Sequence, residues 1–313
     1  MRTDIAAGIA AAAVVLAGCT FGGPPSVQRW ALPSSGSGNV FWLEARDGLV
    51  VINAGSNVTV GRQIAEEISQ TGQRVAAILL SHPHPDQVGG LGVLHEQFPA
   101  AAIFASEATD RWMHQDPRGL YPLARQADPD YPTTPTYATE TFAAEAEMHV
   151  AGITLQTAEF SAGELGTATV YYEPSTRALF AGDLTAHRVT PALTAGNSCE
   201  WLTTLAMISG RFGDADTVYP GRGEPGPAAG HINEQRDYLN SFRQLVRPAV
   251  APNSEAGATV TDRESTQIAT QLDKSYPDYA RVASRPNLQQ LNIAAIGREM
   301  AAEATATMPP ECA

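Results

Sequence analysis

The 313-residue chain has few basic residues and almost no lysine. Lysine and arginine together number 20 against 33 acidic residues, which gives a formal net charge of −13, and Lys274 is the single lysine. Nucleic-acid-binding surfaces need clustered basic side chains, so we expect no nucleic-acid partner. Long apolar runs are equally scarce, because no stretch after residue 18 is long and apolar enough to span a bilayer. With 43% hydrophobic and 17% charged residues, the chain can form a globular fold with a sizeable core.

Cysteine is also rare, and the first of the three cysteines follows an apolar segment at the N-terminus. The run Ile5–Ala17 is too short for a spanning helix and is typical of an export signal. It leads into Leu16-Ala17-Gly18-Cys19, which resembles the lipobox of a bacterial lipoprotein, whose cysteine receives the lipid. We therefore expect residues 1–18 to be a signal peptide and Cys19 to anchor an exported protein in the cell membrane, facing outside the cytoplasm. A buried Ala-rich helix is the alternative interpretation.

The other two cysteines, Cys199 and Cys312, form an even pair in the oxidising compartment that export implies. A disulfide between them would tie the C-terminal tail to the segment near residue 200 and add about 4 kcal/mol in the loop-entropy description. Two unpaired cysteines are the alternative, because a sequence does not show whether two residues approach bonding distance.

The hydrophobic pattern predicts one α/β domain. Short apolar runs separated by turn residues over 27–54 indicate paired strands, and an alternation of helices and strands follows. We expect further strands at 75–80, 101–105, 153–158, 168–172, 178–181 and 217–219, and helices at 58–71, 91–98, 107–114, 199–209 and 231–246. Two strand-rich halves, each joined to helices, predict a monomeric four-layer α/β/β/α sandwich.

The expected boundaries are a linker over 19–38, a main domain over 39–250 and a C-terminal helical extension over 251–313 that packs on the same domain. Residues 117–141 are rich in Pro, Asp, Thr and Tyr and have no clear period, which predicts a surface insertion. An insertion of this kind can overhang a functional site.

The strongest chemical signal follows the apolar run at 75–80. There His82, His84 and Asp86 occupy alternate positions of a loop, and loop residues two apart can converge on one ion. Imidazole suits zinc or iron, and a carboxylate adds a hard anionic ligand. The pattern predicts a metal site, and an ordinary polar surface loop is the alternative.

This loop, LLSHPHPDQVGGL, resembles the HxHxDH metal loop of the metallo-β-lactamase fold superfamily. Four more segments resemble the family's landmarks in the same order within residues 39–245: VINAG at 51–55, SAGELG at 161–166, ALFAGD at 178–183 and VYPGRG at 218–223. The agreement of five landmarks in order is far more specific than any one of them. The resemblance implies the α/β/β/α sandwich, a hydrolytic activity and a metal centre.

The chain departs from the family pattern at four positions. Three family histidines are replaced by Gln87, Glu164 and Arg222, and a usual aspartate is replaced by Asn53. Gln87 and Asn53 would then be remnants of a second metal site. The resemblance leaves four ligands intact: His82, His84, Asp86 and Asp183.

The charges expected at the centre favour fewer metal ions than the family uses. Asp86, Asp183 and Glu164 contribute three negative charges and Arg222 one positive charge, so one divalent ion brings the sum to zero. A guanidinium pairs with carboxylates through two hydrogen bonds, so Arg222 can replace the second ion.

We therefore expect at most one metal ion, with zinc preferred and iron not excluded. Its expected ligands are His82, His84 and Glu164, with Asp183 as a fourth. A site without metal is the alternative, because protonation of both histidines also brings the sum of charges to zero.

The resemblance implies hydrolysis of an ester, lactone or thioester bond in a small molecule. Asp86 would orient or deprotonate the attacking water, and Arg222 or the metal would stabilise the developing oxyanion. His187, four residues after Asp183, is a candidate proton donor or replacement ligand, and an ordinary loop histidine is the alternative. A catalytically inactive ligand-binding lipoprotein is the second hypothesis, and a mononuclear iron oxygenase ranks last.

Overall fold

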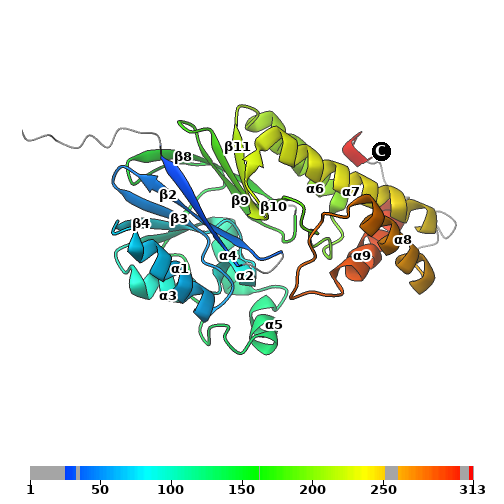
Figure 1. The fold of residues 1–313 in the computed structure, drawn as a ribbon, viewed down its shortest axis with the longest axis horizontal. Coiled ribbons are helices and arrows are strands. Elements are labelled where there is room, and N and C mark those ends of the chain that lie inside the picture. The colour runs from blue at the N-terminus through cyan, green and yellow to red at the C-terminus, as the bar shows by residue number, and fades with distance from the viewer. Residues whose placement is uncertain (1–24, 33–35, 162, 251–259, 304–309, 313) are drawn as a thin grey trace, which may run out of the picture.

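The computed structural model describes residues 25–32, 36–161, 163–250, 260–303 and 310–312. Two six-stranded sheets pack face to face, and helices cover the outer face of each sheet (Figure 1). The expected signal peptide and Cys19 lie outside the described residues. Among the helices of the described ranges, none combines the length and the apolar character needed to cross a membrane.

The first sheet contains strands β1 to β6 in sequence order. Its antiparallel part is β1 to β3, and β3 to β6 run parallel. The strands are β1 (Ser26–Ala31), β2 (Asn39–Ala45), β3 (Gly48–Ile52), β4 (Val75–Leu79), β5 (Ala102–Ser106) and β6 (Glu140–Phe142). The helices of this half are α1 (Val58–Gln70), α2 (Pro85–Val88), α3 (Leu91–Gln97), α4 (Glu107–Gln115) and α5 (Leu120–Ala127).

Helix α1 shows how local sequence determines the outer layer. The Asn57 side chain accepts a hydrogen bond from the Val60 N–H at 2.9 Å and so caps the helix. Val60, Ile64 and Ile68, each four residues from the next, form its buried face against the first sheet. This spacing is what the sequence pattern over 58–71 predicted.

The second sheet has the order β12-β11-β10-β9-β8-β7, in which β10 and β11 run parallel. Its strands are β7 (Glu147–Val150), β8 (Ile153–Phe160), β9 (Ala168–Glu173), β10 (Ala178–Ala186), β11 (Thr217–Arg222) and β12 (Gly226–Pro227). The helices of this half are α6 (Ser198–Arg211), α7 (Ala228–Val250), α8 (Asp262–Ser275), α9 (Leu288–Glu303) and the 3-10 turn η2 (Pro310–Cys312).

Three apolar layers hold the sandwich together. Phe41, Leu79 and Phe180 are buried between the two sheets, where both faces must be apolar because neither meets water. The other two layers join each sheet to its own helices, and Trp201 is fully buried in the layer of the second half. The predicted four-layer α/β/β/α sandwich with C-terminal helices is confirmed.

Two segments differ in part from the sequence prediction. Strand β1 agrees with the paired strands expected over 27–54, and its residues pair with β2 from Ser26 opposite Glu44 to Ala31 opposite Asn39, but it also lies inside the range 19–38 expected to be a linker. Helix α5 lies inside the insertion at 117–141, for which no regular structure was expected. It has no fully buried residue, and Gly119 and Asp128 flank it on either side.

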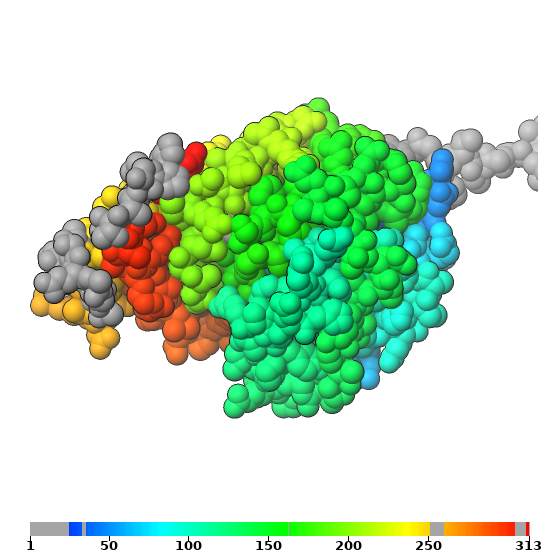
Figure 2. Space-filling model, turned by 180° about the vertical axis from the view of Figure 1, so that it is seen from behind, coloured from blue at the N-terminus to red at the C-terminus, as the bar shows by residue number. Residues whose placement is uncertain are grey.

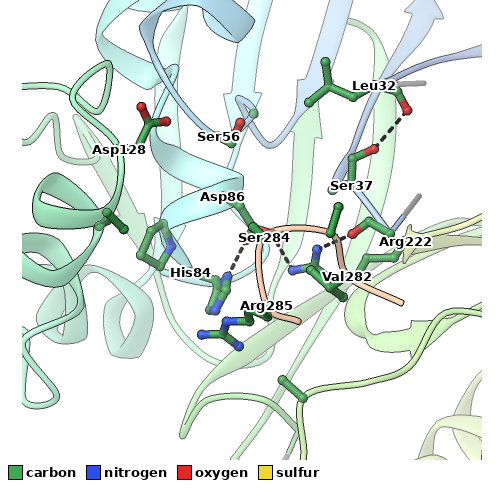
Figure 3. A pocket seen from close by; sticks show the side chains of 18 of the residues that line it. Leu32, Ser37, Ser56, His84, Asp86, Asp128, Arg222, Val282, Ser284 and Arg285 are labelled. Atoms are coloured by element: carbon green, nitrogen blue, oxygen red, sulfur yellow. Dashed lines mark hydrogen bonds and ion pairs between the residues drawn. The ribbon is translucent and has the colours of Figure 1, made fainter. Parts of the chain in front are cut away.

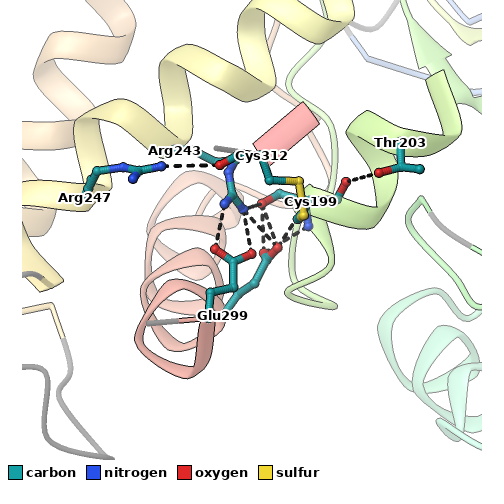
Figure 4. Close-up of a disulfide and its surroundings, with 8 residues drawn as sticks. Cys199, Thr203, Arg243, Arg247, Glu299 and Cys312 are labelled. Atoms are coloured by element: carbon teal, nitrogen blue, oxygen red, sulfur yellow. Dashed lines mark hydrogen bonds and ion pairs between the residues drawn. A yellow bond between two sulfur atoms is a disulfide. The ribbon is translucent and has the colours of Figure 1, made fainter. Parts of the chain in front are cut away.

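The C-terminal extension packs against the second half of the molecule, as the orange and red atoms beside the yellow-green ones show (Figure 2). The structure joins Cys199 and Cys312 by a disulfide, with Cα atoms 5.4 Å apart (Figure 4). Next to it, the Glu299 carboxylate on α9 accepts hydrogen bonds from the backbone N–H groups of Ser198 and Cys199, each at 2.9 Å. These N–H groups belong to the first two residues of helix α6, so the negative carboxylate also interacts favourably with the positive end of the helix dipole.

Candidate metal and active site

The candidate site lies where strands of both sheets end. Strand β4 leads into the loop that carries His82, His84 and Asp86, and β10 carries Asp183. Strand β11 ends at Arg222 and runs so close to β10 that a Cβ atom on Gly221 would lie 1.9 Å from Oδ1 of Asp183. The absence of a side chain at 221 therefore lets the two strands bring their charged residues together.

Arg222 is the hub of this cluster, and its side chain is 3% exposed. Its Nη2 group donates to Oδ2 of Asp86 at 2.6 Å and to Oδ2 of Asp183 at 2.9 Å. The same nitrogen lies 4.0 Å from Oε2 of Glu164, and Nη1 donates to the Gly36 carbonyl at 2.9 Å. A single cationic group thus faces all three carboxylates that the sequence placed at the centre.

The ion pairs change the protonation of these groups. Burial favours neutral carboxylic acids, but the charges of Arg222 and the neighbouring histidines outweigh it. They hold the pKa of Asp86 well below its usual range and lower the pKa of Asp183 to about 2. Burial also disfavours the Arg222 cation, yet the carboxylates raise its pKa further above the ordinary value. Both aspartates are therefore ionised at neutral pH.

His84 and Asp86 form a close pair. Nδ1 of His84 lies in hydrogen-bond contact with Oδ1 of Asp86, and Nε2 of His84 lies 3.9 Å from Oε2 of Glu164. Burial disfavours the imidazolium, but the charge of Asp86 and its hydrogen bond outweigh burial and raise the pKa of His84. Asp86 thus stabilises the protonated imidazole of His84.

A buried chain of hydrogen bonds orients the His82 ring through its Nδ1 atom. Its Nδ1 lies 2.9 Å from the Ser81 hydroxyl, and Ser81 donates its backbone N–H and hydroxyl to Oδ1 of Asn53, each at 3.0 Å. Asn53 has a positive φ of 67°, a conformation that asparagine adopts more readily than most residues. The structure therefore places Asn53 as a support for the His82 loop.

Gln87 contacts the Asp183 oxygen that Arg222 does not bond. Its side-chain amide donates to Oδ1 of Asp183 at 3.2 Å, and its carbonyl oxygen is buried without a hydrogen-bond partner. Oδ1 of Asp183 therefore bonds to Gln87 and Oδ2 bonds to Arg222. The Gln87 amide and the Arg222 guanidinium thus bond to different oxygens of the same aspartate.

Buried atoms without partners test whether these residues fit a metal ion. Nε2 of His82 and Oε2 of Glu164 are both buried and have no hydrogen-bond partner. Nε2 of His82 lies 3.4 Å from Oδ2 of Asp183, and His84 and Glu164 approach to 3.9 Å. Adjacent ligands of a tetrahedral zinc ion lie roughly 3.3 Å apart, given zinc–ligand bonds of about 2 Å. Each of the two pairs is therefore spaced closely enough for both members to bind a common ion.

A second possible set of metal ligands includes Asp86. One ligand atom from each of His84, Asp86 and Asp183 lies within 4.8 Å of the others, so these three residues form a group that can hold a metal ion. In the structure, however, Arg222 already bonds to both aspartates. The two sets share His84 and Asp183.

His187 is placed away from the cluster. Its Nε2 lies 3.6 Å from Oε2 of Glu234, and its ring packs against His231 with centroids 3.9 Å apart. Its backbone N–H donates to the Arg222 carbonyl at 3.0 Å, but the side chain is not among those that line the main cavity. Burial lowers the pKa of His187. This placement does not support His187 as a proton donor or a replacement ligand.

The cluster opens into a cavity of about 400 Å3 (Figure 3). His84, Asp86, Glu164 and Arg222 lie at its polar end. Helix α5 forms part of its wall, so the insertion at 117–141 does overhang the site. Two further contributions, the Gly36 carbonyl and the Arg285 side chain, could not be predicted, because both lie in segments without a recognisable motif.

Known proteins resemble this chain in fold and sequence. The sandwich with a histidine and carboxylate cluster at the strand ends is the architecture of a class of metal-dependent hydrolases. The sequence model of the Metallo-beta-lactamase superfamily matches residues 34–252, and the chain belongs to this superfamily. A beta-lactamase domain protein from Burkholderia ambifaria superposes with a TM-score of 0.63 at 16% identity and covers 89% of this chain and 85% of its own.

Relatives in sequence match shorter stretches. A probable metallo-hydrolase of Streptococcus pyogenes is 28% identical over 90 residues, which are 29% of this chain and 38% of that protein. Exodeoxyribonuclease WalJ of Streptococcus pneumoniae is 32% identical over 78 residues, which are 25% of this chain and 29% of that protein. The matched regions thus span less than half of these relatives.

Proposed function

We propose that this protein hydrolyses ester, lactone or thioester bonds and uses one divalent metal ion, with zinc preferred. The ligands in this proposal are His82, His84 and Glu164, with Asp183 as a fourth. The observation that carries it is the pair of buried ligand atoms without partners, Nε2 of His82 and Oε2 of Glu164. A buried polar atom without a partner is costly unless something binds it, and a cation satisfies both.

Arg222 supports a site for one ion. Its guanidinium bonds to Asp86 and Asp183, so those carboxylates already have a cation. A second divalent ion at this place would meet the fixed positive charge of Arg222 at close range. We infer that Arg222 takes the place of the second ion.

The chemistry that zinc supplies in such a ligand set is Lewis acidity, which makes a neighbouring water more acidic. Asp86 remains ionised, because Arg222 and His84 hold its pKa well below the usual range. Both of its oxygens are bonded, one to each of these residues, so Asp86 positions water and is a poor acceptor of a proton at neutral pH. Arg222 contributes positive charge where the oxyanion develops.

Zinc content and turnover test the proposal together. The full chain, purified without added metal, should contain about one equivalent of zinc per molecule by plasma mass spectrometry, and it should hydrolyse a chromogenic ester such as p-nitrophenyl butyrate. Replacement of His82 or His84 by alanine should remove both properties. His114→Ala is the matched control, because His114 lies on α4 with a side chain that is 53% exposed. Zinc retention or unchanged turnover in the two site variants would refute this assignment.

A catalytically inactive ligand-binding protein is the second candidate. It is favoured by the Arg222 ion pairs, which compensate two carboxylates without a metal. If this candidate is right, zinc will not raise the melting temperature, because only an ion that binds the folded state stabilises it. A clear zinc-dependent rise would eliminate the candidate.

We also propose that the protein is an exported lipoprotein, with residues 1–18 as the signal and Cys19 as the lipidated residue. The Cys199–Cys312 disulfide supports this location, because disulfides persist in oxidising compartments. Labelling with radioactive palmitate in a bacterial host should mark the wild-type protein in the membrane fraction. The Cys19→Ala variant should carry no label, and a labelled variant would disprove this site of lipidation.

A further inference from the structure

Part of the wall of the cavity in front of the cluster comes from residues beyond the range that the superfamily model matches. Leu120, Leu123 and Ala124 of helix α5 line one side, and residues 282–288 lie beyond the matched range of 34–252. Val282 and Leu288 are the buried apolar residues of that second segment. The insertion and the C-terminal extension thus give an apolar wall to a cavity whose inner end is polar.

Arg285 places a positive charge in this apolar wall. It lines the same cavity as His84 and Asp86, and Figure 3 shows Arg285 and His84 directed into a common space. Arg285 is half-buried. Its guanidinium forms no ion pair or hydrogen bond with the described part of the chain.

The carboxylates that line the cavity face groups other than Arg285. Glu164 accepts a hydrogen bond from the Ala192 N–H at 2.9 Å through Oε1, and its Oε2, which has no hydrogen-bond partner, lies 4.0 Å from Nη2 of Arg222. Asp86 bonds to Arg222 and His84, and Asp128 accepts hydrogen bonds from the Asn57 side chain at 2.8 Å and the Asp130 backbone at 2.9 Å. A guanidinium is planar and can donate two parallel hydrogen bonds to one oxyanion. The unpaired Arg285 is therefore suited to an oxyanion that arrives with a ligand.

We propose that the cavity selects an amphipathic substrate, in which an apolar chain packs against α5 and an oxyanion group binds Arg285. The proposal rests on the hydrolase function above and names its substrate class: an ester, lactone or thioester that also carries a carboxylate or a similar oxyanion. Leu123 provides the exposed apolar surface for the chain, with a relative exposure of 56%. Arg285 is then a specificity-determining residue contributed by the extension.

Binding of two matched small molecules tests this proposal without turnover. The full chain is treated with EDTA and titrated calorimetrically with octanoate and with octanamide, which share the apolar chain and differ in charge. Octanoate should bind about tenfold more tightly, as expected for a partly exposed charge-assisted hydrogen bond. Arg285→Gln should remove this preference, Arg285→Lys should keep part of it, and Leu123→Asn should weaken both ligands.

Arg281→Gln is the matched control. Arg281 lies four residues away on the same segment, but its guanidinium pairs with Asp273 at 2.5 Å and does not line the cavity. The control should retain the preference for octanoate. Equal affinity for the two ligands, an undiminished preference in Arg285→Gln, or no binding of either ligand would overturn the proposal. Zinc stoichiometry is measured on the same preparation before EDTA, so a failed metal site is distinguished from a failed anion site.

Discussion

Nη2 of Arg222 donates a hydrogen bond to Oδ2 of Asp183 at 2.9 Å, and each of the two side chains is only 3% exposed. The same nitrogen also bonds to Asp86, so one organic cation serves two carboxylates at the centre of the sandwich. A buried charge is tolerated only when it is paired, which makes Arg222 and the aspartates mutually dependent.

Removal of the Arg222 charge should destabilise the protein strongly in the absence of metal. Arg222→Ala leaves buried carboxylates without their cation, and the free energy of unfolding in EDTA should fall by roughly 3–5 kcal/mol. Urea denaturation measures this change, and added zinc should restore part of the loss. Arg46→Ala is the control, because the Arg46–Asp47 pair is exposed and its removal should have little effect. A loss no larger than that of the control would contradict the role of Arg222.

The metal-free protein should lose stability in acid. The pKa of Asp183 in the fold is about 2, below its ordinary value of 3.8, so its contribution is complete above that ordinary value. The contribution is lost as the pH falls from about 4 through 2, and it amounts to about 2 kcal/mol at 1.36 kcal/mol per unit. Asp183→Asn should flatten this part of the profile. Denaturation midpoints in EDTA at several pH values measure it, and a profile that stays equally steep in the variant would count against the ion pair.

Introduction of histidine at positions 87 and 222 should create a second metal site. The double variant Gln87→His, Arg222→His removes the fixed positive charge and supplies two neutral imidazoles beside Asp86 and Asp183. Its zinc content should rise from about one to about two equivalents in mass spectrometry. The single variant Gln87→His keeps Arg222 and should remain at one, so a second ion in that variant would show that Arg222 does not exclude it.

Loss of the disulfide should lower stability without affecting the metal site. The bond links residues 113 apart in sequence, and the double variant Cys199→Ala, Cys312→Ala should lose about 4 kcal/mol in the loop-entropy description. Chemical denaturation of the variant and of the reduced wild type should agree with each other. Zinc stoichiometry should stay at that of the wild type. A variant as stable as the oxidised protein would show that the packing of α9 alone holds the tail.

Much of the fold could be predicted because its elements carry strong local signals. Helix α1 has a capping asparagine and a clear apolar period, and β4 is an uninterrupted apolar run, so both lie within a residue of the expected bounds. Strand β10 extends to Ala186, beyond the expected 178–181, because its charged Asp183 interrupts the apolar pattern although the residue is buried. Pattern alone cannot reveal a buried charge whose partner lies on another strand.

The sequence predicted which residues form the site better than it predicted how they contact one another. The motifs identified His82, His84, Glu164 and Arg222, and the structure brings all four to one place. The support from Asn53 could not be predicted, because it depends on a positive φ and on a hydrogen bond to Ser81 across two strands. Helix α5 and Arg285 were missed because neither shares a motif with the family.

The carboxylate of Glu299 and the disulfide at Cys199 together attach the C-terminal extension to the first turn of α6. The same extension brings Val282, Arg285 and Leu288 to the cavity. A chain shortened to the matched residues 34–252 would therefore have a wider cavity entrance and would lack the positive charge of Arg285. In the proposed substrate complex, the residues that select the substrate would thus lie on a different segment from the residues that surround the reacting bond. Exchange of such tails between homologous scaffolds offers a route to transfer selectivity without altering the residues that surround the reacting bond.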